Sequence, residues 1–197
     1  MDTIENETFH QLQPSLKAME NLSFANCRFV GADLREVQST RCTFNQCDFS
    51  GAKFNASSHV KSAFLNCAFR GANFFGTRFD QCKMTGSSFV EAKWTGIEIT
   101  GGDWSYCLLP YANLAKTDFS GIRMIEADLT QADLRGCLFR QADLTRSILA
   151  GARLKGADLR DAHLGGIDFR QVKLDGITID VAQAAIIISS LGAHVQA

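Results

Sequence analysis

An apolar residue returns at every fifth position of this chain from Phe24 to Ile179. Of the 32 positions at that spacing, which we call centres, all but Ser39 and His59 carry Phe, Leu, Ile, Met or Trp. A smaller residue, most often Ala, Cys, Ser or Thr, lies two positions before each centre, so the unit reads A(D/N)LxG. A five-residue period matches neither an α-helix nor a continuous strand, and the repeat itself must therefore be the structural unit.

Each repeat predicts one short extended side followed by one corner. The small residue and the centre are two positions apart, which places both on the inward side of an extended segment. The next small residue comes three positions later, so a corner must intervene to keep it facing inward. Glycine collects at the second corner residue, as at Gly31 and Gly51, where a type II turn needs a positive φ. Four sides close a coil of 20 residues, and the 32 repeats predict about eight coils.

This pattern resembles that of the pentapeptide repeat proteins over about 160 of the 197 residues. The resemblance implies an all-β solenoid, namely a right-handed quadrilateral β-helix of about eight coils with a short C-terminal capping and dimerisation helix. We expect an irregular N-terminal segment over residues 1–20, the β-helix over residues 21–179, and a helix and tail that form a dimerisation module over residues 180–197.

The sequence after Ile179 is typical of a helix. Asp180 can cap it, Gln183 completes a capping box, and Gly192 can end it. The apolar residues between these points cover most of the helix circumference, which is more than the end of one coil stack needs. The excess predicts a homodimer joined through this helix. The expected contacts come from Val181, Ala184, Ile187, Ile188 and Leu191.

Composition excludes several classes of protein. The formal net charge of -1 argues against general electrostatic attraction to nucleic acid or to an anionic membrane, so we expect no direct nucleic-acid binding and no membrane association. The N-terminus lacks a signal-peptide pattern, which predicts a cytoplasmic location. On the side whose centres run from Leu34 to Leu174, basic residues outnumber acids. The basic residues of this side are Arg35, Lys53, Lys93, Lys116, Arg135, Arg153, Lys155 and Lys173.

The residues that carry reactive chemistry follow the repeat rather than a catalytic or metal-binding spacing. All seven cysteines occupy the small inward position, which predicts buried, reduced core residues. Ser39 and His59 lie 20 residues apart, on the same side of adjacent coils, and predict a local bulge or loop. We find no phosphate-binding loop and no nucleophile motif, so we expect no enzyme activity, no catalytic residues, no metal and no cofactor.

The stretch Glu91–Cys107 departs from the pattern. Its centres include Trp94 and Trp104, while Ile97 and Gly102 fill the small inward positions, one too large and the other without a side chain. Side chains of the wrong volume displace the backbone of a close-packed coil, so a kink is expected. The kink is either a packing adjustment between the Phe-rich and Leu-rich halves or a distortion that faces a partner.

Within the family, the length, the unbroken register and the apolar C-terminal helix are most similar to the gyrase-protecting group. That group includes the albicidin-resistance protein and the mycobacterial fluoroquinolone-resistance protein. The resemblance implies a homodimer that binds DNA gyrase as a DNA-shaped rod and protects it from topoisomerase poisons. The alternative is a repeat scaffold for an unidentified protein partner.

The charge limits how closely such a rod can imitate DNA. Duplex DNA carries one charge per ~1.7 Å, so a dimer of about 80 Å would need on the order of 45 negative charges, whereas twice the net charge of -1 gives -2. Contacts must then depend on shape and local acidic patches. The candidate contact residues are Glu91, Trp94, Asp103, Asp128, Asp158, Asp161 and Asp168.

Overall fold

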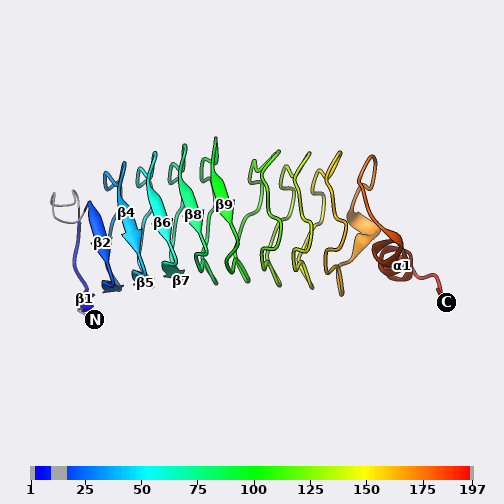
Figure 1. The fold of residues 1–197 in the computed structure, drawn as a ribbon, viewed down its shortest axis with the longest axis horizontal. Coiled ribbons are helices and arrows are strands. Elements are labelled where there is room, and N and C mark those ends of the chain that lie inside the picture. Colours follow the sequence, from blue (N-terminus) through cyan, green and yellow to red (C-terminus); the bar gives the residue numbers. More distant parts are fainter. Residues whose placement is uncertain (1–2, 10–16, 196–197) are drawn as a thin grey trace.

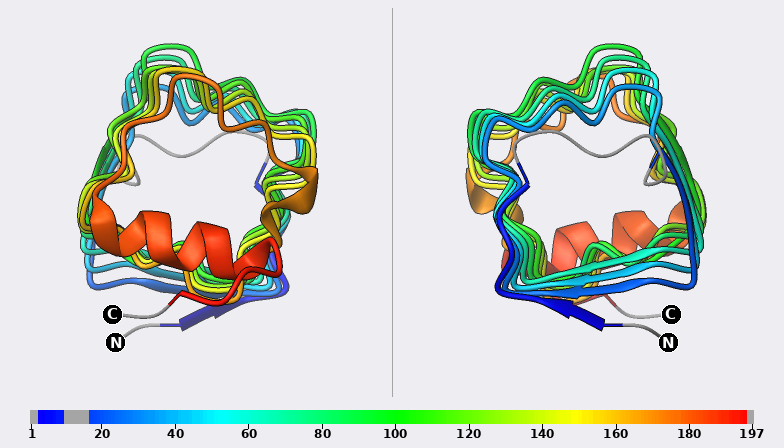
Figure 2. Two further views of the ribbon diagram at one scale, coloured as in Figure 1. Left: turned by 90° about the vertical axis from the view of Figure 1, so that its right-hand side faces the viewer. Right: turned by 90° about the vertical axis from the view of Figure 1, so that its left-hand side faces the viewer.

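The computed structural model describes residues 3–9 and 17–195. The chain winds into a stack of similar coils, with a helix at the C-terminal end (Figure 1). Viewed along the stack, the coils superpose on one roughly four-sided outline (Figure 2). The all-β solenoid that the five-residue period predicts is confirmed.

Two sides of the coil form regular parallel sheets in the N-terminal half, with strand orders β1-β3-β5-β7 and β2-β4-β6-β8-β9. Paired residues lie 20 positions apart, as in Phe24 opposite Phe44. The first sheet contains β1 (Thr3–Glu5), β3 (Ser23–Ala25), β5 (Thr43–Asn45) and β7 (Ala63–Leu65). The second contains β2 (Ala18–Glu20), β4 (Gln38–Thr40), β6 (Ser58–Val60), β8 (Arg78–Asp80) and β9 (Glu98–Thr100).

The other sides and the later coils pair through isolated parallel bridges with the same 20-residue offset, as far as Asp158 opposite Thr178. The ladder already begins at Thr3, which pairs with Ser23. The coil register therefore extends into the segment expected to be irregular, and the coil count differs slightly from eight.

The centres fill the interior as predicted. Every centre from Phe24 to Phe169 is buried. In the N-terminal half the rings stack from coil to coil, with centroid separations of 4.9 Å for Phe24–Phe44 and 4.7 Å for Phe44–Phe64. Such offset stacks add about 0.5–1.5 kcal/mol per pair beyond the burial of their area.

The left-handed corners are also confirmed, and glycine is not their only occupant. Gly31 and Gly51 have φ of 66° and 67°, but Glu36 and Ala56 adopt 61° and 56° at equivalent corners. A left-handed non-glycine residue costs roughly 1–2 kcal/mol. The hydrogen bonds on both sides of each corner hold these residues in place, so the ladder rather than the glycine fixes the corner.

The sequence signals for the C-terminal helix are confirmed in detail. Helix α1 (Val181–Ser190) follows a 3-10 turn, η2 (Phe169–Gln171). Asp180 Oδ1 accepts from the N–H of Ala182 at 2.8 Å, and Gln183 Oε1 accepts from Asp180 N–H at 3.0 Å. The buried Gln183 also donates to the carbonyl of Ala162. The helix is thus anchored across the C-terminal end of the stack (Figure 2).

The bulge expected at Ser39 and His59 is wrong. Both residues lie inside regular strands, β4 and β6, and face each other in the ladder. His59 Nε2 lies 3.0 Å from Ser57 Oγ, and Ser39 Oγ lies 3.0 Å from Ser62 Oγ. Polar partners therefore satisfy the two residues within the core, and the backbone has no reason to depart from the repeat.

The burial predicted for all seven cysteines is confirmed. Most of their thiols donate to a carbonyl 23 residues earlier, as Cys107 does to Met84 at 3.1 Å. Burial raises the pKa of Cys82 and of Cys137 to about 12. These thiols are small hydrogen-bonded core groups rather than nucleophiles.

Candidate functional site

The ladder of the solenoid is interrupted immediately after β9, where Figure 1 shows a wider gap between two coils. Lys93 pairs with Asn73, and Glu98 pairs with Arg78. In the next coil Asn113 pairs with Asp133, yet within the described residues Lys93 does not pair with Asn113. The two coil edges that border the gap, which we call its lips, therefore each pair with the coil on their outer side and have no pairing partner on the side of the gap. We call this gap the inter-coil cleft.

Backbone hydrogen bonds are missing on two adjacent sides of the coil. In the neighbouring coils each centre on these sides donates to a carbonyl 19 residues later, as Phe74 does to Lys93 at 2.8 Å and Leu114 does to Asp133 at 3.0 Å. Across the cleft the described structure contains no such bond. The N–H groups without the expected bond belong to Trp94, Gly96, Ile99, Gly101, Asn113 and Asp118. The other two sides stay paired, so the two coils are hinged along them.

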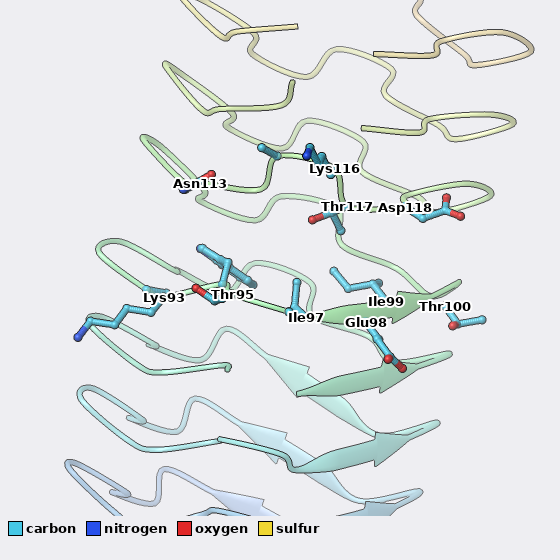
Figure 3. A pocket seen from close by; sticks show the side chains of 14 residues that line it. Lys93, Thr95, Ile97, Glu98, Ile99, Thr100, Asn113, Lys116, Thr117 and Asp118 are labelled. Carbon is cyan, nitrogen blue, oxygen red and sulfur yellow. The ribbon is translucent and has the colours of Figure 1, made fainter. Parts of the chain in front are cut away.

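The cleft has a volume of about 930 Å³. Lys93 lies toward one end and Asp118 toward the other, while Lys116 lies near the middle (Figure 3). Ile97 and Thr117 lie between these ends and come from opposite lips (Figure 3). The site therefore combines opposite charges at its two ends with a centre that contains Ile97 and Lys116.

The irregular stretch of the sequence forms one lip of the cleft. Ile97 stands where other coils carry a small residue and is only partly buried. Gly102 has φ of 101°, and a Cβ there would lie 2.2 Å from the carbonyl oxygen of Cys82. The structure thus places the interruption next to the two residues of unsuitable volume. The far lip follows the repeat, and for this reason sequence reasoning missed Asn113, Lys116 and Thr117.

Trp94 contributes a polar group that lacks a partner. Its side chain lines the cleft and its residue is 5% exposed. The indole Nε1–H has no acceptor among the described residues, and the same holds for Trp104. A buried donor without a partner costs about 1–3 kcal/mol, which favours a ligand that supplies an acceptor.

The structure does not bring the candidate acids together. Asp103, Asp128 and Asp158 fall on three different sides, in the ladders that continue to Arg123, Ile148 and Thr178. Glu91 and Asp161 occupy corners, where both have a positive φ. There is accordingly no continuous acidic face built from these residues.

Arginine neutralises several of these acids. Asp158 is held by Arg140 and Arg160, each at 2.7 Å, and its side chain is only 10% exposed. Glu91 pairs with Arg70 at 3.2 Å, and Asp103 with Arg123 at 3.7 Å. Asp128 and Asp161 form no ion pair within the described part of the chain. Among the acidic contacts proposed from the sequence, only the partly buried Asp128 and the exposed Asp161 are therefore left without an ion pair in the described structure.

Asp168 shows the effect of such pairing on a carboxyl group. Arg170 donates to both of its carboxylate oxygens at 2.8 Å. These hydrogen bonds lower the pKa of Asp168 to about 2. The carboxylate therefore stays ionised but presents a compensated pair to a partner.

The residues expected at the dimer interface divide between two faces of α1. Val181, Ile188 and Leu191 are exposed at 87%, 47% and 51%. Ala184 is partly buried, whereas Ile187 is buried at 3% against its own chain. Val181, Ile188 and Leu191 therefore form the exposed apolar face, whereas Ile187 packs against the core of its own chain.

Other kinds of site are not apparent. No group of three or more His, Cys, Asp or Glu residues able to hold a metal is found over residues 3–9 and 17–195. Across those same ranges, every helix is too short or too polar to cross a membrane.

The family model for pentapeptide repeats matches residues 21–58, 61–93, 107–141 and 137–176, in eight copies. The chain belongs to this family. The matched segments omit residues 94–106, which contain both tryptophans and most of the first lip of the cleft. The irregularity of the cleft is therefore visible as a departure from the family pattern.

The chain is similar to MfpA and to QnrB1. Pentapeptide repeat protein MfpA of Mycobacterium tuberculosis is 34% identical over 66 residues, which cover 31% of this chain and 36% of MfpA. The match thus spans about a third of that relative. A trypsin-treated form of QnrB1, a plasmid-mediated fluoroquinolone resistance protein, is 25% identical, with a TM-score of 0.87 over 98% of this chain and 97% of QnrB1.

The fold alone is shared more widely. HetL, a pentapeptide repeat protein involved in heterocyst differentiation regulation in the cyanobacterium Nostoc, superposes with a TM-score of 0.62 at 19% identity and covers 89% of this chain. Rods of this architecture therefore occur in proteins with different roles.

Proposed function

We propose that this protein binds DNA gyrase as a DNA-shaped homodimeric rod and protects the enzyme from topoisomerase poisons such as fluoroquinolones or albicidin. The observation that carries the proposal is the likeness to QnrB1, which extends over 98% of this chain and includes the C-terminal end. The partial match to MfpA supports the same class of role.

The exposed face of α1 supports the dimer. Val181, Ile188 and Leu191 expose apolar side chains beyond what the capped coil covers. Two copies that meet through this face would lengthen the rod without changing its cross-section. Gyrase would then recognise the rod by its shape, because a net charge of -1 per chain cannot reproduce the charge of DNA.

The ion-paired surface supports recognition by shape. Asp158, Asp168 and Asp103 are each compensated by arginine, and Glu91 pairs with Arg70, so among the candidate acids only Asp128 and Asp161 lack an ion pair in the described structure. The alternative is a scaffold for another protein, and HetL shows that this fold also occurs in a protein with a different role.

Competition for gyrase separates the two possibilities. Purified gyrase is incubated with labelled linear DNA and increasing amounts of this protein, and DNA retention is measured. The proposal predicts displacement of DNA and recovery of gyrase with the protein in a pull-down from bacterial lysate. Recovery of a different protein, with no displacement of DNA, would support the scaffold.

A further inference from the structure

We propose that the inter-coil cleft binds an extended segment of a partner protein that carries an acidic residue followed by a basic one, and that this segment adds as a strand between the two coils. The identification of that partner as gyrase rests on the proposed function, whereas the cleft and its ligand class rest on the geometry alone.

The backbone of the cleft supports strand addition. Both lips are strand edges that run in the same direction and are paired on their outer sides, to Asn73 and to Asp133. The facing N–H and C=O groups lack the bonds that they form in every neighbouring coil. An extended peptide between the lips can bond to both edges, which is the general mode of β-augmentation.

The charged residues of the cleft indicate which side chains a bound segment should carry. Lys93 lies toward one end, Glu98 and Asp118 lie toward the other, and Lys116 lies between them at the corner (Figure 3). None of these four residues forms an ion pair with another described residue. A segment with an acidic residue at the lysine end and a basic residue at the carboxylate end is complementary to both.

The residues at the centre of the cleft indicate that the bound segment should carry an apolar residue between its two charged ones. Ile97 is partly buried and faces the gap from the first lip. Trp94 lines the gap, and its indole N–H lacks an acceptor in the described structure. An apolar side chain of the bound segment would cover Ile97.

The direction of the segment follows from the solenoid. Both lips run from the lysine end to the carboxylate end, and all ladders in this chain are parallel. A strand that continues this arrangement carries its acidic residue first and its basic residue second. It also needs a corner between them, because the lips turn at Gly96.

A synthetic peptide built on the repeat provides the probe. Acetylated ADLSGARLS amide places Asp, a Gly corner and Arg in the order that the cleft requires, and the control peptide exchanges Asp and Arg. Hydrogen–deuterium exchange of the whole protein is followed at the amides of Trp94, Gly96, Asn113 and Asp118. We expect rapid exchange in the free protein and slower exchange with the first peptide.

A matched pair of variants tests the charge. Lys53 occupies the position of Lys93 on the same side, 40 residues earlier, and the ladder is intact there. The double variant Lys93→Glu/Lys116→Glu should weaken binding of the first peptide about tenfold, because its Asp loses an ion pair with Lys93 worth up to ~1 kcal/mol and meets carboxylates in place of both ammonium groups. The control Lys53→Glu/Lys155→Glu should leave the affinity unchanged.

Three results would overturn the proposal. The first is strong protection of the four amides in the free protein, equal to that of the paired amides of Phe74 and Asp133. The second is no protection by the peptide at millimolar concentration, and the third is equal weakening by both double variants. Peptide binding in the cleft together with unprotected gyrase would instead refute the proposed function and leave the cleft proposal standing.

Discussion

The hydroxyl oxygen of Ser39 lies 2.7 Å from Nδ1 of His59, and both residues are buried in the core of adjacent coils. The imidazole stacks on Phe79 at a centroid distance of 5.2 Å. A histidine thus replaces a phenylalanine in the stack, and three serines form a small polar enclosure around it.

This enclosure predicts a pH dependence of stability. Burial lowers the pKa of His59 from 6.5 to about 3. Because the unfolded chain takes up a proton below pH 6.5 and the folded chain does not, stability is complete above pH 6.5 and is lost as the pH falls toward 3. The maximum loss is on the order of 5 kcal/mol.

The variant His59→Gln isolates this contribution. It keeps a polar side chain for Ser39 and Ser57 but cannot titrate. Urea unfolding from pH 7 to pH 4 should show a smaller loss of unfolding free energy in the variant than in the natural chain. Equal slopes would mean that carboxyl groups alone cause the acid sensitivity.

The inward position of Gly102 should tolerate a side chain far less well than an ordinary corner does. Gly51→Ala places a Cβ that meets nothing closer than 4.0 Å, so it should cost only the left-handed penalty of about 1–2 kcal/mol. Gly102→Ala brings a Cβ to 2.2 Å from the backbone oxygen of Cys82 and should cost roughly 4 kcal/mol or more. Thermal unfolding of the two variants measures the difference, and similar melting temperatures would show that the coil adapts.

Substitutions in the C-terminal helix should affect dimerisation and folding separately. Ile188→Asp places a charge on the exposed apolar face, which should yield folded monomers in sedimentation because burial of an unpaired charge at the interface is costly. Ser189→Asp adds the same charge one position along and should remain dimeric. A dimeric, well-folded Ile188→Asp protein would move the interface elsewhere. Ile187→Asp should instead destabilise the monomer, because that side chain is buried.

The cysteines should be inert in the folded protein. Burial raises the pKa of Cys107 and of Cys67 well above the ordinary value of a thiol. A thiol reagent at pH 8 should therefore modify the native protein slowly and all seven cysteines rapidly in denaturant. Rapid modification of one thiol in the native state would identify a coil that opens locally.

The sequence predicts nearly all of the fold, because the five-residue period fixes the inward positions, the corners and the register together. Asp180 and Gln183 likewise specify the helix cap. The sequence does not predict that Ser39 and His59 remain in regular strands, since this depends on hydrogen bonds between coils. It locates the irregular lip at Ile97 and Gly102, but the opposite lip at Asn113 and Thr117 has ordinary repeat residues.

The ion pairs explain why acidic residues are hard to interpret from the sequence alone. Asp158 and Arg140 are 18 residues apart, and only the coil brings them within 2.7 Å. A repeat pattern shows where an acid points, but whether it is free depends on the next coil.

Supercoiling by purified gyrase in the presence of a poison tests the central claim most directly. A fluoroquinolone or albicidin is titrated with and without this protein, and the monomeric Ile188→Asp variant serves as the control. The account predicts that the natural protein restores supercoiling and lowers the amount of poison-stabilised cleaved DNA, whereas the monomer does so poorly. An unchanged response to both poisons, with folded dimer in excess over gyrase, would contradict it.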